Sequence, residues 1–141
     1  MSVRQLSVFL ENRVGRLAAI AELLGNAGVN IGALPVADTR DFGILRLLVD
    51  DVDKAEKVLK ANEVVCHINE VTAIEVDNHP GGLAKLLQKL NAAGVNVEYM
   101  YALAEPKSQR PVMIFRFSES RKALEALEGT GMHTLSEEEL F

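Results

Sequence analysis

The sequence predicts an α+β fold made of two ferredoxin-like βαββαβ repeats, expected to lie side by side as one eight-stranded antiparallel sheet with the helices on one face. Three observations lead to this prediction. The segment ENRVGRLAAIAELLGNAGVNI at 11–31 recurs as DNHPGGLAKLLQKLNAAGVNV at 77–97. Strand-like and helix-like patterns alternate in the same order in both halves. A proline also lies in the second strand of the first half, as expected for the edge of a sheet.

The first half follows the order strand, helix, strand, strand, helix, strand. In its first helix, apolar residues from Leu17 to Leu24 recur at spacings of three and four, and Gly28 supplies the left-handed residue that ends a helix. The turn signal DTRDFG separates the two middle strands, and aspartates in DDVDKAEKVLKAN are candidates to cap the second helix. The expected strands are 3–10, 29–36, 44–49 and 64–68, and the expected helices are 17–24 and 50–62.

The second half repeats this order. Corresponding residues are 66 positions apart up to Asn96 and 68 apart at Val112, so the hairpin loop AEPKSQRP is two residues longer than its counterpart. Changes in length are typical of surface loops. The tail SEEELF is expected to be a solvated acidic turn. The expected strands are 71–76, 95–103, 112–117 and 132–135, and the expected helices are 83–92 and 121–127.

We expect the two repeats to span 1–69 and 70–141. Units of roughly 65 residues are marginal as isolated cores, so the repeats should share a sheet or pack together. In a βαββαβ unit with strand order 4-1-3-2 the second strand is an edge, and Pro35 supports this because proline cannot donate to a ladder. Since an open edge is a liability, we expect strand 29–36 to pair antiparallel with strand 95–103, within one chain or across a dimer.

The composition argues against several classes of protein. No window of the 141 residues approaches the roughly 20 uninterrupted apolar residues of a membrane span, so a soluble protein without membrane association is expected. The N-terminus lacks an apolar run with a cleavage site, and Cys66 is the single cysteine, which together indicate the cytoplasm. A net charge of −5 with scattered basic residues argues against nucleic acid as a partner.

The chain also lacks recognisable catalytic and metal-binding motifs. Cys66 and His67 are neighbours on a strand, so their side chains point to opposite faces and cannot easily hold one metal. The other two histidines have no ligand-like spacing, and no serine or cysteine stands in a nucleophile elbow. We therefore expect no metal, no cofactor and no catalytic residues, and a protein that is not an enzyme.

The loop between the first strand and first helix of each repeat has the chemistry of a small-molecule site. The first N–H groups of a helix lack intrahelical acceptors and carry partial positive charge, so they attract a carboxylate. Gly15 and Gly81 let a ligand approach the backbone because they have no Cβ. Asn12 and Asn78 each offer a donor and an acceptor without net charge, which suits either end of a zwitterion.

Two further asparagines, Asn30 and Asn96, stand at the start of the edge strands. Together with the loops they would frame two equivalent clefts between the repeats, sized for a free amino acid. A structural interpretation remains open, because an asparagine before a helix is often an N-cap and one after Gly-Val is often a turn residue. Gly28 and Gly94 are expected to be helix caps and not ligand-binding residues.

The motifs NRVG and NHPG, each followed by a helix and then by AGVN, resemble the ACT domain, the βαββαβ regulatory module of amino-acid metabolism. The resemblance covers both halves, as in tandem stand-alone ACT proteins, and the first copy is also similar to the serine-sensing regulatory domain of phosphoglycerate dehydrogenase. It implies that an amino acid binds between paired modules. The implied binding residues are Asn12, Val14, Gly15, Asn30 and Ile31 in the first copy, and Asn78, Pro80, Gly81, Asn96 and Val97 in the second.

The first copy departs from the family pattern at Val14, where proline is usual, so its loop keeps an N–H and loses a fixed φ. That change is expected to loosen the first site. The second copy keeps Pro80 and adds Gly82, which would either widen the approach to the site or soften the start of the helix.

The function expected from these features is a non-catalytic regulatory protein that senses a small neutral amino acid in clefts between the repeats. Its expected partners are a free amino acid, possibly an enzyme of amino-acid metabolism, and a second copy in a homodimer. The alternatives are a ligand-free interaction scaffold or a regulatory subunit of such an enzyme. An RNA-binding module is disfavoured, because the segments LSVFL and ILRLLV carry no pair of stacking aromatics with basic flanks.

Overall fold

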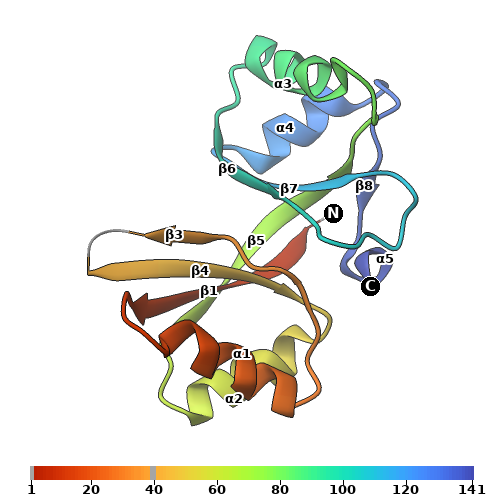
Figure 1. Ribbon diagram of the computed structural model, residues 1–141. Helices are drawn as coiled ribbons and strands as arrows, with labels where there is room; N and C mark the ends of the chain where they lie inside the picture. Colours follow the sequence, from red (N-terminus) through yellow and green to blue (C-terminus); the bar gives the residue numbers. More distant parts are fainter. Residues whose placement is uncertain (1, 39–40) are drawn as a thin grey trace. The chain divides into compact units, whose positions relative to one another are not determined.

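A computed structural model describes residues 2–38 and 41–141 of the chain. These residues form two compact units, each of which has its own helices and strands (Figure 1). The first unit is Arg4–Asn69. The second unit is the remainder, which starts at Glu70 and also includes the short segment that ends at Val3.

The first unit is a βαββαβ module with the strand order expected of a ferredoxin-like fold. Strand β1 lies between β4 and β5, and both β2 and β3 pair antiparallel with β4. The amide of Phe9 in β1 donates to the carbonyl of Val65 at 3.0 Å, just before β5 begins. The elements are β1 (Val3–Glu11), α1 (Arg16–Asn26), β2 (Ile31–Ala33), β3 (Val36–Asp38), β4 (Phe42–Val49), α2 (Val52–Ala61) and β5 (Cys66–Glu75).

The second unit repeats the module with the strand order β8-β5-β7-β6, all antiparallel. Strand β5 thus serves as the last strand of the first repeat and as the first strand of the second. After β5 the elements are α3 (Gly82–Ala92), β6 (Val97–Ala102), β7 (Val112–Phe117), α4 (Ser120–Leu127), β8 (Thr134–Leu135) and α5 (Glu137–Leu140).

The shared strand is where the sequence and the structure differ most. The sequence predicted two strands, 64–68 and 71–76, and the structure has one continuous strand. Asn69 and Glu70 interrupt the apolar pattern, but they do not interrupt the extended backbone. Because β5 is common to both repeats, all eight strands follow one hydrogen-bonded order, and the predicted α+β fold with eight antiparallel strands is confirmed.

The edge strands do not pair as predicted within one chain. Strand β2 pairs with β4 and strand β6 pairs with β7, so the two stand at opposite ends of the strand order. The prediction that 29–36 lies against 95–103 in a single chain is therefore wrong, and pairing across a dimer stays a prediction. The first edge is also broken at Pro35, whose carbonyl accepts from the Arg46 amide at 3.0 Å.

The predicted DTRDFG turn includes residues 39–40, which lie outside the described residues.

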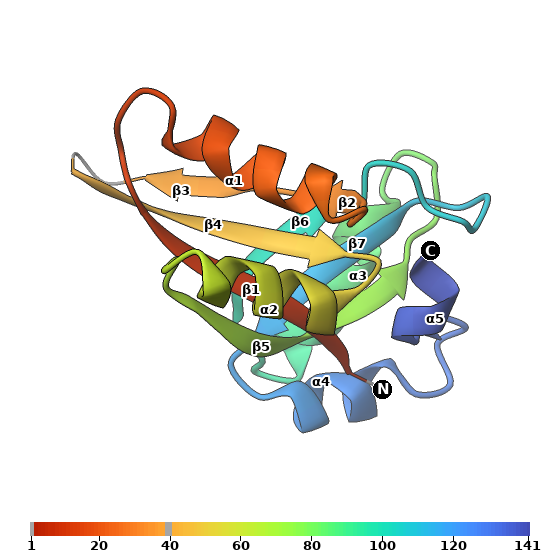
Figure 2. The same ribbon diagram turned by 90° about the horizontal axis from the view of Figure 1, so that it is seen from below.

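In each unit two helices cover one face of the strands, as Figure 2 shows for α1 and α2 beside β1 and β4. The cores form because alternate residues of each strand and the apolar stripe of each helix meet there. The first core includes Leu6, Val8, Leu10, Ile20, Leu24, Leu45, Leu47, Leu59 and Cys66, and the second includes Ile74, Val76, Leu86, Leu90, Val95, Phe115, Phe117 and Leu127.

The acidic tail differs from the expected solvated turn. It forms a single helical turn, α5, in which Ser136 and Glu139 make a reciprocal capping box and Leu140 is buried. The backbone amide of Ser136 donates to the Glu139 carboxylate at 3.1 Å, and this bond lowers the pKa of Glu139. A buried leucine and a cap therefore order a segment that composition alone describes as solvated.

Candidate functional site

The two loops that were singled out as a candidate site have the same backbone conformation. Gly15 (φ 89°, ψ −16°) and Gly81 (φ 87°, ψ −6°) are left-handed residues that directly precede α1 and α3. In the first loop the Arg16 amide donates to the Arg13 carbonyl at 3.3 Å, and in the second the Gly82 amide donates to the His79 carbonyl at 3.0 Å. The replacement of proline by Val14 therefore leaves the loop conformation intact.

Neither Asn12 nor Asn78 caps its helix. The N-cap positions are occupied by Gly15 and Gly81, and no side-chain capping bond is present at either described helix start. Asn78 is exposed, and its side chain makes no hydrogen bond within the part of the chain that the structure describes. Asn12 is also exposed, and its amide donates to the Asp41 carbonyl at 2.9 Å. The N-cap interpretation of these two residues is thus wrong.

Asn78→Ala should therefore change the free energy of unfolding by less than about 0.5 kcal/mol, as expected for an exposed side chain. Asp51→Ala is the matched control, because the Asp51 carboxylate accepts from the Lys54 amide at 3.1 Å and caps α2. It should cost about 0.5–2 kcal/mol. Urea unfolding followed by circular dichroism measures both variants, and equal losses would contradict this assignment of caps.

The asparagines at the edge strands are fixed through their backbones. The Asn30 amide donates to the Asp50 carboxylate at 2.9 Å, and the Asp50 amide returns a bond to the Asn30 carbonyl at 3.1 Å. Asn96 makes the same pair of bonds with Ser118, at 3.1 and 2.9 Å. Both asparagine side chains are exposed and have no hydrogen bond within residues 2–38 and 41–141. Each is thus held in place by its backbone, with its side-chain amide exposed.

Sequence analysis missed Asp50 and Ser118 as partners of these asparagines. A signal was present, because they stand 68 positions apart, the same spacing as the hairpin strands that precede them. Ile31 and Val97, by contrast, are partly buried and pack against the cores of their own units. Their side chains therefore serve packing.

Within one repeat the loop and the edge-strand asparagine are not brought together. Helix α1 runs between Gly15 and Asn30, and α3 runs between Gly81 and Asn96, so the two parts lie at opposite ends of a helix (Figure 1). Each of these helices has 11 residues. A helix of that length is about 16 Å long, much longer than a free amino acid. A site that uses both parts must therefore combine residues of different repeats or of different copies.

The second loop is held by a network of charged residues that the sequence did not indicate. Arg110, in the long β6–β7 loop, forms ion pairs with Asp77 and with Glu75, the latter at 3.6 Å. The Ser108 hydroxyl donates to the Glu75 carboxylate at 3.0 Å. The β6–β7 loop thus braces the segment that leads into the second candidate loop.

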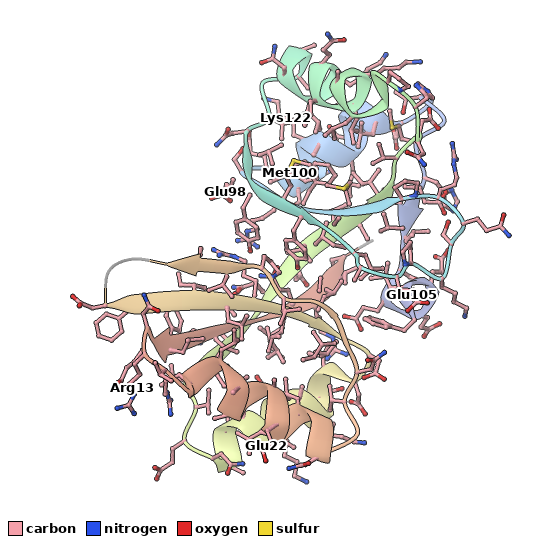
Figure 3. All side chains as sticks on the ribbon, in the orientation of Figure 1. Arg13, Glu22, Glu98, Met100, Glu105 and Lys122 are labelled. Atoms are coloured by element: carbon pink, nitrogen blue, oxygen red, sulfur yellow. The ribbon has the colours of Figure 1, made fainter. Side chains whose placement is uncertain are left out.

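The first loop carries a different set of charges. Arg13 pairs with Glu11 at 3.2 Å, and its side chain projects outward from the loop before α1 (Figure 3). Val14 beside it is fully exposed. The two loops therefore share a backbone conformation but present different side chains around it.

Residues 2–38 and 41–141 contain no group of three His, Cys, Asp or Glu side chains that could hold a metal ion. Cys66 is buried in the first core, and burial raises the pKa of its thiol, with a smaller contribution from the Glu56 carboxylate. Among the described residues, no helix is both long enough and apolar enough to cross a membrane.

Comparison with solved structures identifies relatives that share this architecture. Protein BT0572 from Bacteroides thetaiotaomicron is 42% identical, with a TM-score of 0.88, over 96% of this chain and 92% of that one. The regulatory subunit of aspartate kinase from Thermus thermophilus is 17% identical, with a TM-score of 0.62, over 91% and 92% of the two chains. At that identity the second likeness concerns the fold alone.

A curated sequence relative is the acetolactate synthase small subunit of Buchnera aphidicola subsp. Baizongia pistaciae. The two are 32% identical over 82 residues, which cover 56% of this chain and 52% of the relative. The chain thus spans about half the length of this relative. The family model described as an ACT domain pair, a type of module typical of regulatory amino-acid-binding proteins, matches residues 1–141. The chain therefore belongs to the ACT domain pair family.

Proposed function

We propose that this protein is a non-catalytic regulatory protein that binds a small neutral amino acid through its two β–α loops. The observation that carries the proposal is the duplication of the loop, in conformation as well as in sequence. Gly15 and Gly81 both adopt the left-handed geometry, and each is preceded by an exposed asparagine that does not cap the helix. Two helix starts that lack a side-chain cap and that each follow an exposed asparagine are better suited to a ligand than to stability.

The chemistry of the loops favours a zwitterion. The helix N-terminus supplies backbone donors for a carboxylate, and the absence of a Cβ at Gly15 and Gly81 leaves these donors accessible. No atom lies within 4 Å of where a Cβ would stand at either glycine. Exposed amides of Asn30 and Asn96 are suited to accept from the ammonium group of the ligand. Uncharged contacts of this kind select a neutral amino acid over an acidic or basic one.

We further propose that the complete site is formed in a homodimer. The loop and the edge-strand asparagine of one repeat are separated by the length of a helix, so a second copy can supply the missing part. Strands β2 and β6 each pair on one side, with β4 and β7, which leaves an edge available to a partner. Pairing of these edges between copies would bring an asparagine of one copy beside a loop of the other.

A second candidate function is that of a regulatory subunit of an enzyme of amino-acid metabolism. The observation in its favour is the similarity to an acetolactate synthase small subunit over 82 residues. The two functions are compatible, because a subunit that binds an amino acid can report its concentration to a catalytic partner. A ligand-free scaffold is the alternative, and it predicts no amino-acid binding at all.

Calorimetry with each of the twenty amino acids tests the proposal. A small or medium neutral amino acid should bind with a Kd between micromolar and millimolar, which corresponds to about 4–8 kcal/mol. Asn78→Ala should weaken this binding without lowering the melting temperature, whereas Asp51→Ala should lower the melting temperature without weakening binding. If none of the twenty amino acids, at several millimolar, gives a heat of binding or raises the melting temperature, the ligand-free scaffold is favoured.

A further inference from the structure

The two repeats differ at the place where the first strand of a repeat meets the start of its second helix. In the first repeat this place is closed by contacts within the repeat. The Arg4 guanidinium pairs with the Asp53 carboxylate at 2.9 Å, and Leu6 beneath them in the sequence of β1 is fully buried. The helix start is also satisfied, because the Asp51 carboxylate caps α2 by accepting from the Lys54 amide at 3.1 Å.

The same place in the second repeat is an open pocket. Glu70 corresponds to Arg4 at a spacing of 66 residues, and Arg121 corresponds to Asp53 at a spacing of 68. The two charges are therefore exchanged, but no ion pair joins them in the described part of the chain. Arg121 pairs instead with Glu125 of its own helix at 3.5 Å. Both residues line a pocket of about 400 Å³ that lies within the second unit.

A buried hydroxyl group lines this pocket. Thr72 takes the position of Leu6, and its neighbour on β7, Phe115, takes that of Leu47 on β4, so the strand register supports the correspondence. Thr72 is 3% exposed, and its side chain makes no hydrogen bond to any residue that the structure describes. Its hydroxyl is not among the polar atoms that the described chain encloses completely, so it keeps access to the pocket. A buried polar group without a partner is unfavourable, and a bound molecule can supply that partner.

The start of α4 adds further donors to the pocket. Its first residue, Ser120, is exposed and stands where the first repeat has the buried Val52. Its N-cap residue, Glu119, makes no capping bond, and the Glu119 carboxylate pairs with Lys122 at 3.7 Å. The first N–H groups of α4 therefore have no side-chain acceptor. Together with the Thr72 hydroxyl, these groups favour an oxyanion at the start of α4.

We propose that this pocket binds a small phosphorylated polyol, of the chemical class of glycerol 3-phosphate. The phosphate accepts from the first amides of α4, from the Thr72 hydroxyl and from the Arg121 guanidinium, and its three oxygens suit several donors at once. The Glu70 carboxylate can only accept, so it takes a hydroxyl group of the ligand and disfavours an anion that has none. The pocket volume of about 400 Å³ also exceeds that of a phosphate ion and lies in the range of small-molecule sites, roughly 300–1,000 Å³.

The pocket is separate from the duplicated loops. The pairing of β5 with β7 runs from Thr72 and Phe115 at one end to Glu75 and Val112 at the other. Helix α4 follows β7 and therefore begins at the first of these ends, whereas the loop of Gly81 follows β5 and leaves from the second. This proposal therefore does not rest on the proposed amino-acid binding, and each can fail without the other.

The experiment is calorimetry on the full chain with glycerol 3-phosphate, and with methyl phosphate as the probe that lacks a hydroxyl group. Glycerol 3-phosphate should bind at one site per chain and more tightly than methyl phosphate. Thr72→Val and Arg121→Gln should each weaken the binding of glycerol 3-phosphate by about tenfold or more, as expected for the loss of a hydrogen bond to a charged group. Lys57→Gln, which removes an exposed positive charge from α2, is the control and should have no effect.

Glu70→Ala should remove the preference for glycerol 3-phosphate, so that both probes bind this variant with similar affinity. Thr72→Val should not lower the melting temperature, because it replaces a hydroxyl that has no partner by a methyl group of similar size. If it does disturb the fold, Arg121→Gln is the deciding variant, since that side chain is 94% exposed. The proposal is overturned if glycerol 3-phosphate gives no heat of binding at several millimolar. It is equally overturned if methyl phosphate binds the wild type as tightly, or if a folded Thr72→Val variant binds as the wild type does.

Discussion

Gly82→Ala is expected to lower the free energy of unfolding by about 1–3 kcal/mol, the usual cost of forcing extra volume into a packed position. A Cβ at this buried residue would stand 3.1 Å from the carbonyl carbon of Asp77 and closer still to its oxygen. The backbone of Asp77 cannot move away freely, because its side chain is held by Arg110. Urea unfolding measures the change.

Gly25→Ala is the matched control within α1. No atom lies within 4 Å of its potential Cβ, so alanine should raise the free energy of unfolding by about 0.4–1 kcal/mol through the unfolded state. The two glycine variants should therefore shift stability in opposite directions. If both shifted it upward, the loop at Asp77 would be free to move, and the bracing inferred from Arg110 would have no effect on the candidate site.

Much of the fold could be predicted from the sequence because the same pattern of strands and helices appears in both repeats. The strand Val112–Phe117 has the predicted bounds, and α1 and α3 begin within one residue of their predicted starts. The continuous β5 could not be predicted, because the polar pair Asn69 and Glu70 looks like a connection. The structure keeps that pair extended within β5, and such an extended conformation depends on the folded context more than on local sequence.

The candidate site also has features that the sequence predicted and features that it did not. The repeated motif indicated glycines at positions 15 and 81, and both adopt the left-handed conformation that glycine tolerates. The brace from Arg110 to Asp77 joins residues 33 positions apart, and no spacing rule indicates such a pair. Residue identity can suggest which groups interact, but the partners of a side chain are fixed only by the folded chain.

The edge strands show where a sound local argument led to a wrong arrangement. Pro35 lies between β2 and β3, which both pair with β4, so the sequence correctly placed this segment at an edge, and an edge does require cover. Of the two alternatives that the sequence left open, only pairing within one chain is wrong, and pairing across a dimer stays a prediction. Sharing β5 already joins the two repeats, so the edges β2 and β6 stand at opposite ends of the strand order.

Leu24→Ala and Leu90→Ala should each lower the free energy of unfolding by about 2–5 kcal/mol, because each removes a buried leucine from the core of its repeat. The two residues are equivalent positions of α1 and α3, 66 residues apart, and are 0% and 1% exposed. They belong to core clusters that share no residue, so their effects should add to within about 0.5 kcal/mol in the double variant.

Each single variant should also unfold in one transition and not in two. Strand β5 contributes Cys66 and Ile68 to the first core and Ile74 to the second, so losing one repeat removes a strand from the other. Calorimetric and van't Hoff enthalpies that agree would support this coupling. Two separate transitions in Leu24→Ala, with the later one at the wild-type temperature, would mean that the second repeat folds without the shared strand being held by the first.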